Sequence, residues 1–416
     1  MQARETRLAK WRRLYPVLSD LEEAARRRLP YYVFDYLQGA TGEELSRLRN
    51  IDALRSIEIV PRYGVDIAEA NTRTTLFGRD FAAPLAISPI GMDGAIWPGA
   101  SRHLAAAARE AGIAYMQSSM AATSMEAAAA VAKDSFWFQL YGFPADDHAV
   151  TFDLVRRARE AGAHVLAVTL DIPGPARRVR DMRNGLAVPL RISPAMALGT
   201  AIRPAWLAAL AQAGMPRFEN LAPYCRDGAG KAEIDAFVGK GRPGAGITWE
   251  TVARIRDAWS GALALKGILH PADAERAMKL GADGLIVSNH GGRQFDPAPA
   301  PIDVLPAIRA AVGEKATVLV DSGFMSGTDI LKALACGADG VMAGRAFMLG
   351  LAALGADGPR HVAATMKEEL QIALGQTGAC TLEGARALSV RHRNAWKPED
   401  FGPPLTADKK TKSKQG

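Results

Sequence analysis

The sequence has few cysteines and no long hydrophobic run, and each shortage excludes a class of protein. Its 416 residues include three cysteines, Cys225, Cys336 and Cys380, which are widely spaced and form no CxxC pair. This spacing argues against a disulfide scaffold or a structural zinc site and fits a reducing compartment. No window reaches about 18 uninterrupted apolar residues, so the sequence predicts no membrane-spanning helix.

The sequence also lacks a secretory signal. Its first residues, MQARETRLAKWRRLYP, are basic but contain no apolar core of roughly 7–15 residues, so we expect a cytoplasmic protein. The net charge is +7, and part of it lies in the tail ADKKTKSKQG (407–416), which is typical of a disordered basic end. The tail favours solubility, with peripheral contact to the anionic inner face of the cell membrane as the alternative. Basic residues are not interleaved with aromatics, which argues against nucleic-acid binding.

Apolar residues, by contrast, make up 48% of the chain, which is enough for a large core. The length fits one large barrel with additions. Residues 1–80 are expected to form an N-terminal helical segment. In its stretch LSDLEEAARRRL (18–29) the apolar residues have helical spacing, Ser19 and Glu22 match a capping pattern, and Pro30 ends the helix.

A different pattern begins at residue 84 and predicts a (β/α)8 barrel over residues 81–385. Short apolar runs alternate with helical stretches such as SRHLAAAAREAG, which is typical of a parallel sheet covered on both faces. A doubly wound open sheet is the alternative, but ISPIGMDGA is a poor match to its glycine-rich phosphate turn. Eight runs are the number that a closed barrel needs. They are PLAISP (84–89), IAYMQS (113–118), FWFQLYG (136–142), HVLAVTLD (164–171), LALKG (263–267), GLIVSN (284–289), TVLVDSG (317–323) and GVMAGR (340–345).

One gap interrupts this alternation. More than 90 residues separate the fourth run from the fifth, far more than one helix needs. We assign part of them, about 186–245, to an insertion that contains the apolar and basic stretch RISPAMALGTAIRPAWLAALAQAGMP. Unstructured loops of such length are usually functional or disordered. Residues 386–416 are expected to form a C-terminal extension.

Polar residues stand at the ends of the eight runs, where chemistry occurs in a barrel. One polar strand end means little, but eight that converge on one mouth predict a site. The residues are Ser88, Ser118, Gln139 and Tyr141, Thr169 and Asp171, Lys266, Ser288 to Arg293, Asp321 to Gly323, and Gly344 with Arg345.

The residue types at these ends favour redox chemistry on a hydroxy acid. His290 can accept a proton near neutral pH, and Asp171 could orient it and stabilise its charged form. Arg293 offers a planar fork that suits a carboxylate, and the buried ammonium of Lys266 must meet negative charge. The stretches DSG (321–323) and GR (344–345) follow the last two runs, where barrels often bind phosphate.

The motifs SNHGGRQFD, FQLYG, LALKG and VLVDSG resemble the FMN-dependent α-hydroxy acid dehydrogenase and oxidase family. The match extends from about residue 16 to residue 385, in order and with the family's spacing. Within that family DGAIWPGAS, RPAW, GMPRFEN and DSGF are most similar to the mandelate dehydrogenase branch. The resemblance implies FMN as the cofactor, an (S)-2-hydroxy acid as the substrate and a homotetramer as the assembly.

The resemblance also implies roles for individual residues. His290 would remove a proton from the substrate with Asp171 as its partner, by a mechanism that fits hydride transfer as well as a carbanion route. Arg293 and Arg178 would clamp the substrate carboxylate, with Arg177 as an alternative to Arg178. Tyr36 in FDYLQGA would bind the carboxylate and Tyr141 would lie near the hydroxyl, while Lys266 would face flavin N1 and O2. The flavin ring and ribityl chain would contact Pro89, Ile90, Gly91, Ser118, Gln139, Thr169 and Ser288. The phosphate would contact Gly323, Gly344 and Arg345, and Asp321 and Ser322 also belong to the expected cofactor site.

Three departures from the family pattern bear on this reading. Met325 and Ser326 replace two arginines, and the loss of a buried cation should weaken FMN binding unless another arginine substitutes. Ile90 replaces a threonine beside the flavin, and the stretch IPGPARR carries an extra proline. These changes leave open an alternative function, in which the same flavin barrel supports oxidative decarboxylation, a monooxygenase reaction or another specialised substrate.

Two further features concern the substrate and the electron acceptor. Gly91 replaces the alanine of the enzymes for small acids, which leaves room for an aromatic or bulky substrate unless repacking fills the space of one methyl. The insertion stands where mandelate dehydrogenase carries its membrane-binding segment, and its pattern fits an interfacial helix. A lid packed over the site is the alternative, and a lid seated on a membrane would suit a quinone acceptor. The acceptor is therefore expected to be a quinone or O2.

Overall fold

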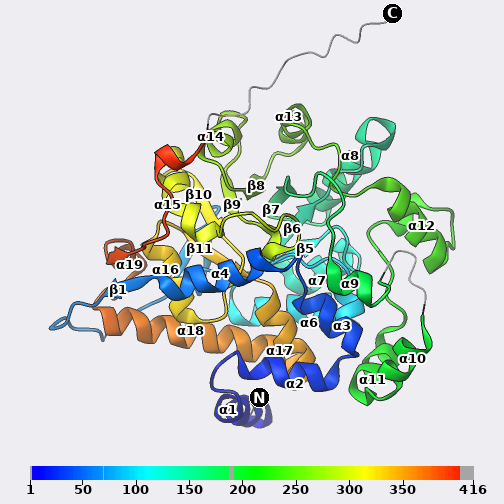
Figure 1. Ribbon diagram of the computed structural model, residues 1–416, viewed down its shortest axis with the longest axis horizontal. Coiled ribbons are helices and arrows are strands. Elements are labelled where there is room, and N and C mark those ends of the chain that lie inside the picture. The colour runs from blue at the N-terminus through cyan, green and yellow to red at the C-terminus, as the bar shows by residue number, and fades with distance from the viewer. Residues whose placement is uncertain (1, 69, 187–191, 403–416) are drawn as a thin grey trace, which may run out of the picture.

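The eight apolar runs form eight parallel strands that close into a barrel, shown at the centre of Figure 1. The computed structural model describes residues 2–68, 70–186 and 192–402. The strands are almost entirely buried, as expected for a sheet with both faces covered. The prediction of a (β/α)8 barrel is confirmed. In spatial order the strands are β10 (Thr317–Val320), β11 (Gly340–Ala343), β4 (Leu85–Ile87), β5 (Ala114–Ser118), β6 (Phe136–Leu140), β7 (Val165–Thr169), β8 (Ala262–Ile268) and β9 (Gly284–Val287).

Helices surround the barrel and supply its outer layer. Their apolar faces join the strands in one large buried cluster. Most of them follow a strand directly, as the alternating pattern predicts. They are α5 (Asp93–Ile96), α6 (Ala100–Ala111), α7 (Met125–Ala132), α8 (Ala145–Glu160), α13 (Trp249–Ala258), α14 (Pro271–Lys279), α15 (Pro301–Val312), α16 (Gly327–Ala335) and α17 (Arg345–Leu354), with α18 (Gly358–Thr377) and α19 (Leu382–Arg386) after the last unit.

One end of the barrel is closed by a hairpin of β2 (Thr74–Leu76) and β3 (Arg79–Phe81). Leu76 and Phe81 belong to the buried cluster inside the barrel, and the ring of Phe77 meets Trp137 edge-on with centroids 5.5 Å apart. Gly284, the first residue of β9, also lies against Phe77. The hairpin therefore seals the end where the strands begin, and the opposite mouth is left for a site.

The N-terminal segment begins with four helices, α1 (Gln2–Leu14), α2 (Asp20–Arg28), α3 (Tyr31–Gln38) and α4 (Leu45–Ser56). Two details differ from the expectation for residues 1–80. Ser19 precedes α2 but makes no capping hydrogen bond with its side chain. Beyond Ser56 the described residues form no further helix before the barrel but the strand β1 (Glu58–Val60) and the hairpin. Strand β1 pairs with β12 (Ser389–Arg391), which lies far away in the sequence.

The short helix α9 (Val179–Arg183) precedes the insertion, and the described part of the insertion contains the helices α10 (Pro194–Ala201), α11 (Pro204–Ala213) and α12 (Lys231–Gly241). Figure 1 shows α10 and α11 at one edge of the molecule, near α2 and α3. Two side chains fasten them there, because Arg203 donates to the carbonyl of Leu29 (2.9 Å) and Tyr32 is bonded to Thr200 (2.9 Å). No helix within the described ranges has both the length and the apolar character to cross a bilayer. The basic tail 407–416 lies outside the described residues.

Candidate active site

Buried polar side chains line the mouth at the ends of β5 to β7. Ser118 donates to Gln139 (2.8 Å), and the amide of Gln139 donates to Thr169 (2.9 Å). All three are at most 1% exposed, so their hydrogen bonds are protected from water. The strand ends thus present a fixed row of neutral hydrogen-bonding groups, which can bind the edge of a planar polar ring.

The next strands place an ion pair beside this row. Lys266, at the end of β8, is 4% exposed and lies 2.9 Å from Asp321 after β10. Its ammonium also donates to Ser288 (2.5 Å). Burial alone would lower the pKa of Lys266, but the carboxylates of Asp321 and Asp171 outweigh it and the pKa is raised. Lys266 is therefore a permanent buried cation at the floor of the mouth.

His290 and Asp171 form a second pair above this floor. The carboxylate of Asp171 lies 2.9 Å from Nδ1 of His290, and the hydroxyl of Tyr141 lies 3.4 Å from Nε2 on the other side of the ring. His290 adopts a left-handed backbone conformation (φ 58°), which turns its side chain toward the strand ends. Gly267 (φ 98°) makes room for the acid, because a Cβ at Gly267 would lie only 2.5 Å from Cβ of Asp171.

The environment sets the protonation of these groups. Burial lowers the pKa of His290, and the nearby Asp171 only partly offsets this, so the imidazole is neutral at pH 7. Burial would raise the pKa of Asp171, but the charges of His290 and Lys266 keep it below its ordinary value. Burial and Asp171 raise the pKa of Tyr141, so its phenol stays protonated. A neutral base beside a fixed carboxylate is the arrangement that accepts a proton.

Two arginines converge on the same space from the loops after β9 and β7. Arg293 donates to the carbonyls of Tyr36 (2.7 Å) and Gly39 (2.8 Å) and stacks over the Tyr36 ring at 4.7 Å. Its second terminal nitrogen is buried and has no hydrogen-bond partner among the described residues. Burial and Arg178 lower the pKa of Arg293. A buried donor without an acceptor indicates a site for an anion, because such a group is costly to leave unpaired.

The structure separates the two candidates in the stretch IPGPARR. Arg178 is half-buried, bonds to Gln294 (3.3 Å) and acts electrostatically on both His290 and Tyr141. Arg177 is exposed, and its carbonyl accepts hydrogen bonds from Thr41 (3.2 Å) and from the backbone of Gly42 (3.0 Å). Arg178 therefore faces the site, whereas Arg177 anchors the loop to the N-terminal segment.

The ends of β10 and β11 form the positive side of the mouth. Gly344 precedes α17, whose free amides favour an anion, and Arg345 donates to the carbonyls of Leu37, Gly39 and Gly291. Burial, and then the charges of Arg293 and Arg47, lower the pKa of Arg345 to about 9. An arginine stays protonated nonetheless, so Arg345 is a buried cation close to other cations, and a bound anion would compensate their charge.

The loop after β10 turns toward this positive side. Ser322 (φ 81°) and Gly323 (φ 106°) both have left-handed backbones. Ser322 donates to Asp321 (2.7 Å) and accepts from the backbone of Gly291 (3.0 Å), which joins the loops after β9 and β10. The two loops thus hold Asp321 against Lys266 and leave Gly323 facing α4.

The loop after β4 forms one wall of the mouth. The hydroxyl of Tyr36 donates to the carbonyl of Gly91 (3.3 Å). A Cβ at Gly91 would meet only Met120 at 3.5 Å and Ser118 at 4.0 Å, which are ordinary contacts. The space of one methyl is therefore open and not filled by repacking. Ile90 packs against the hydrophobic core.

Two supporting contacts were not predicted from the sequence. Asn289 and Asn50 exchange hydrogen bonds (2.6 and 3.0 Å) and so join the loop of His290 to α4. Asp93 accepts from the backbone of Ala122 (2.8 Å) and ties the loop after β4 to the loop after β5. Asp93 and Asn289 lie inside motifs that we quoted, whereas nothing in the sequence around Asn50 indicates its partner.

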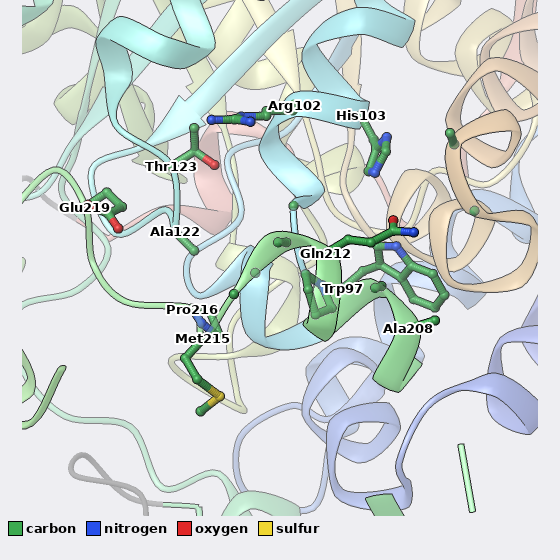
Figure 2. Close-up of a pocket in the computed structure, with 18 of the residues that line it drawn as sticks. Trp97, Arg102, His103, Ala122, Thr123, Ala208, Gln212, Met215, Pro216 and Glu219 are labelled. Atoms are coloured by element: carbon green, nitrogen blue, oxygen red, sulfur yellow. The ribbon is translucent and has the colours of Figure 1, made fainter. Parts of the chain in front are cut away.

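A separate cavity of about 710 Å³ lies beside the site (Figure 2). It is bounded by α11, by the first turn of α6 and by the loops after β4 and β5. Figure 2 shows Trp97, Gln212 and Ala208 on one side of it, with Arg102 and Thr123 on another. The residues His290, Lys266 and Arg293 do not line it.

Comparison with known proteins identifies relatives over most of the chain. A model of the family "FMN-dependent dehydrogenase" matches residues 25–392. An L-lactate dehydrogenase of Caulobacter vibrioides is 38% identical over 361 residues, which cover 86% of this chain and 93% of the relative. A 4-hydroxymandelate oxidase of Amycolatopsis orientalis is 39% identical over 377 residues, which cover 91% and 98%. The crystal structure of the monotopic membrane protein (S)-mandelate dehydrogenase superposes with a TM-score of 0.84 and 33% identity, over 90% of this chain and 98% of the other.

Proposed function

The chain belongs to the FMN-dependent α-hydroxy acid dehydrogenase and oxidase family, and from that premise we propose that it oxidises an aromatic or bulky (S)-2-hydroxy acid to the 2-keto acid. The observation that carries this proposal is the neutral His290, held 2.9 Å from Asp171, in the same loop as a buried Arg293 nitrogen that has no partner among the described residues. A base and an anion site within one mouth match a substrate that carries a hydroxyl and a carboxylate.

The residues of the mouth fit the cofactor of the family. The neutral row Ser118, Gln139 and Thr169 offers donors and acceptors to the polar edge of a flavin ring. The uncompensated charge at Arg345 and the start of α17 fit the phosphate. When FMN is bound, it accepts the two electrons that the substrate loses. We propose that Lys266 stabilises the negative charge that then develops, because its ammonium is a fixed cation in a buried site.

We propose that His290 removes the proton from the substrate and that Asp171 stabilises the imidazolium that results. Asp171 bonds to Nδ1, so Nε2 is the nitrogen that is left to accept a proton. Tyr141 stays protonated and lies beside Nε2, so it can donate a hydrogen bond to the substrate oxygen. These roles require a deprotonated Asp171 and a neutral His290 at the start, as the directions of their pKa shifts support.

Substrate binding is assigned to the two arginines and Tyr36. The free nitrogen of Arg293 and the guanidinium of Arg178 would hold the carboxylate, which orients the 2-position toward His290. The open space at Gly91, about one methyl in size, lies on the wall that Tyr36 contacts and would leave more room for a bulky substrate side chain. We therefore propose that the enzyme prefers mandelate-like acids to lactate. The expected ratio of kcat/KM values is on the order of tenfold, as for a difference of one methylene in a pocket.

We propose a quinone as the electron acceptor, with O2 as the alternative, and peripheral contact with the inner face of the cell membrane. Apolar side chains of the insertion are exposed, notably Leu198 (67%), Ile202 (58%) and Met215 (62%), and such residues suit an interface with lipid. Met215 also lines the cavity, next to Pro216 in Figure 2, and we propose that a planar apolar molecule enters there from a membrane. The homotetramer is proposed from the resemblance alone and is tested by light scattering.

The acceptor proposal is tested with the variant Gln212→Trp, which would narrow the cavity of about 710 Å³. We expect slower oxidation of the reduced enzyme by a soluble quinone and unchanged reduction by substrate. Gln212→Ser is the matched control and should leave both rates unchanged. A Gln212→Trp enzyme that reacts with the quinone as fast as the native enzyme would exclude this cavity as the route.

The reaction itself is tested by anaerobic absorbance spectroscopy of the purified protein with (S)-mandelate and with (S)-lactate. We expect the flavin bands to bleach with both acids, faster with mandelate, and the 2-keto acid to form without oxygen. Products that lack the carboxylate, or that form only with oxygen, would indicate oxidative decarboxylation or a monooxygenase reaction instead. Bound flavin that neither acid reduces would contradict the proposed substrate class.

A further inference from the structure

The loop after β10 carries no cation, although it borders the positive side of the mouth. Met325 packs against the hydrophobic core, and its backbone N–H donates to Asp329 (3.0 Å). The hydroxyl of Ser326 accepts from the backbone of Asp329 (3.1 Å) and so caps α16. Both side chains are thus committed to the fold. If an anion binds at this loop, the cation that neutralises it must come from another element.

Helix α4 is the element that covers this loop. A Cβ at Gly323 would lie 3.2 Å from both the carbonyl oxygen of Asn50 and the side chain of Leu54. At the other end of the helix, a Cβ at Gly292 would lie 2.7 Å from the backbone nitrogen of Arg47. The helix therefore runs in van der Waals contact from the loop of His290 to the loop after β10, and any cation on its inner face borders the mouth.

Most cations near this helix already have a partner. Arg49 donates to the carbonyls of Asp296 and Ala298. Arg55 is exposed and lies 4.0 Å from Asp52. Lys332, which faces α4 from α16, donates to the carbonyl of Leu54 (2.7 Å). None of these three is directed to the positive side of the mouth.

Arg47 is different from the other three. It is half-buried, and its guanidinium makes one contact near the limit of a hydrogen bond, 3.5 Å to the amide oxygen of Gln38. Within the described part of the chain, no carboxylate forms an ion pair with it. Its charge acts on Arg345, whose pKa it helps to lower. The guanidinium groups of Arg47 and Arg345 thus act on each other, and Glu44, which pairs with Arg180, only partly offsets their charge.

We propose that Arg47 binds the phosphate of FMN together with Arg345, and so replaces the cation that the loop after β10 lacks at Met325 and Ser326. The phosphate would lie between the loops of Gly323 and Gly344, where barrels bind such groups. Its two negative charges would neutralise the pair of guanidinium groups, and Arg47 would exchange its long contact with Gln38 for a charge-assisted hydrogen bond. This inference rests on FMN as the cofactor and not on the proposed substrate.

The test compares FMN with riboflavin, which has the same ring but no phosphate. Dissociation of FMN from the full-length holoprotein is followed by the rise in flavin fluorescence on dilution, and the stripped protein is then titrated with each flavin. We expect Arg47→Gln to weaken FMN binding roughly 10- to 100-fold, as for a lost hydrogen bond between charged groups. Riboflavin affinity should change less than about twofold, since riboflavin never makes this contact.

Two further variants isolate the charge. Arg47→Lys should retain most of the FMN affinity, because a cation remains, and Arg55→Gln on the exposed face of α4 should leave it unchanged. Raising the salt concentration should weaken FMN binding more in the native protein than in Arg47→Gln. Equal losses for FMN and riboflavin would mean that Arg47 only supports the fold. Unchanged FMN affinity in Arg47→Gln would overturn the proposal. Neither result would bear on substrate oxidation, which is measured separately by flavin bleaching.

Discussion

The two sides of the barrel mouth are charged in different ways. Near the ends of β7 and β8, the groups assigned to the reaction have partners, since Lys266 lies 2.9 Å from Asp321 and Asp171 lies 2.9 Å from His290. On the side of β10 and β11, and among the residues that the structure describes, Arg345 donates only to carbonyls and Arg47 makes one long contact. The first arrangement is complete before any ligand binds, whereas the second gains its counter-charge from a ligand.

This contrast separates the groups that are expected to act in the reaction from those that are expected to bind the cofactor. Groups that are fixed by their neighbours hold a set geometry and protonation state, which a reaction step requires. Cations that have no acidic partner in the protein can bind an incoming anion directly, because no internal ion pair has to be broken first. Substitutions on the paired side should therefore change rates and pH dependence, and substitutions on the unpaired side should change cofactor affinity.

The largest effect is expected for His290→Gln. The amide keeps hydrogen-bonding capacity but cannot accept a proton, so turnover should fall roughly 100- to 10,000-fold. Bound FMN should stay at native occupancy, because His290 is not on the phosphate side. Steady-state kinetics and the absorbance ratio of flavin to protein measure both quantities. A variant with native turnover would remove His290 from the proposed mechanism.

The next effect is expected for Asp171→Asn. The change removes the carboxylate that raises the pKa of His290, so that pKa should fall further below 6.5. The acidic limb of the pH profile should move to lower pH, while the rate on the plateau falls by roughly 100-fold because the imidazolium loses its partner. The measurement is kcat/KM against pH in the variant and the native enzyme. A limb that moves to higher pH would contradict the assigned charge of Asp171.

A smaller effect is expected for Gly91→Ala, which probes space and not charge. The added methyl would meet Met120 at 3.5 Å, so the fold should tolerate it. Selectivity for mandelate over lactate, measured as the ratio of kcat/KM values, should fall by roughly tenfold. Riboflavin and FMN affinities act as controls and should not change. An unchanged ratio would place the substrate side chain elsewhere in the mouth.

The smallest effect is expected for Met325→Arg, which adds a cation to the unpaired side. In the native background Arg47 already fills this role, so FMN affinity should rise only a few-fold. In the Arg47→Gln background the same change should restore a larger part of the lost affinity. Double-mutant analysis of FMN dissociation constants gives the coupling between the two positions. Strict additivity would show that the two cations do not share one phosphate.

Much of the fold follows from the sequence because it depends on local patterns. The eight buried runs end in polar residues, and a closed parallel barrel brings such ends together, so the proximity of Lys266, Asp171 and His290 could be predicted. The insertion was harder to predict, since its helices are stabilised by contacts such as Arg203 with Leu29, which are 174 residues apart.

The parts that could not be predicted depend on which segments meet in space. Nothing near Arg47 in the sequence shows that α4 covers Gly292 and Gly323, because that contact is made between backbones more than 200 residues apart. The absence of arginines at 325 and 326 was visible, but the residue that compensates for them was not. A departure from a family pattern therefore indicates which loop has lost a group. The residues that pack against that loop in the fold are the ones that can compensate for it.

The most direct test of the account is the second-order rate constant for anaerobic reduction of bound flavin by (S)-mandelate, measured from about pH 5 to about pH 9. With a neutral His290 as the base, the rate should rise with pH through an apparent pKa below 6.5 and then reach a plateau. Tyr141 should add no falling limb in this range, because its pKa is raised above its ordinary value of 10.0. A rate that falls as pH rises through this range would contradict His290 as the base.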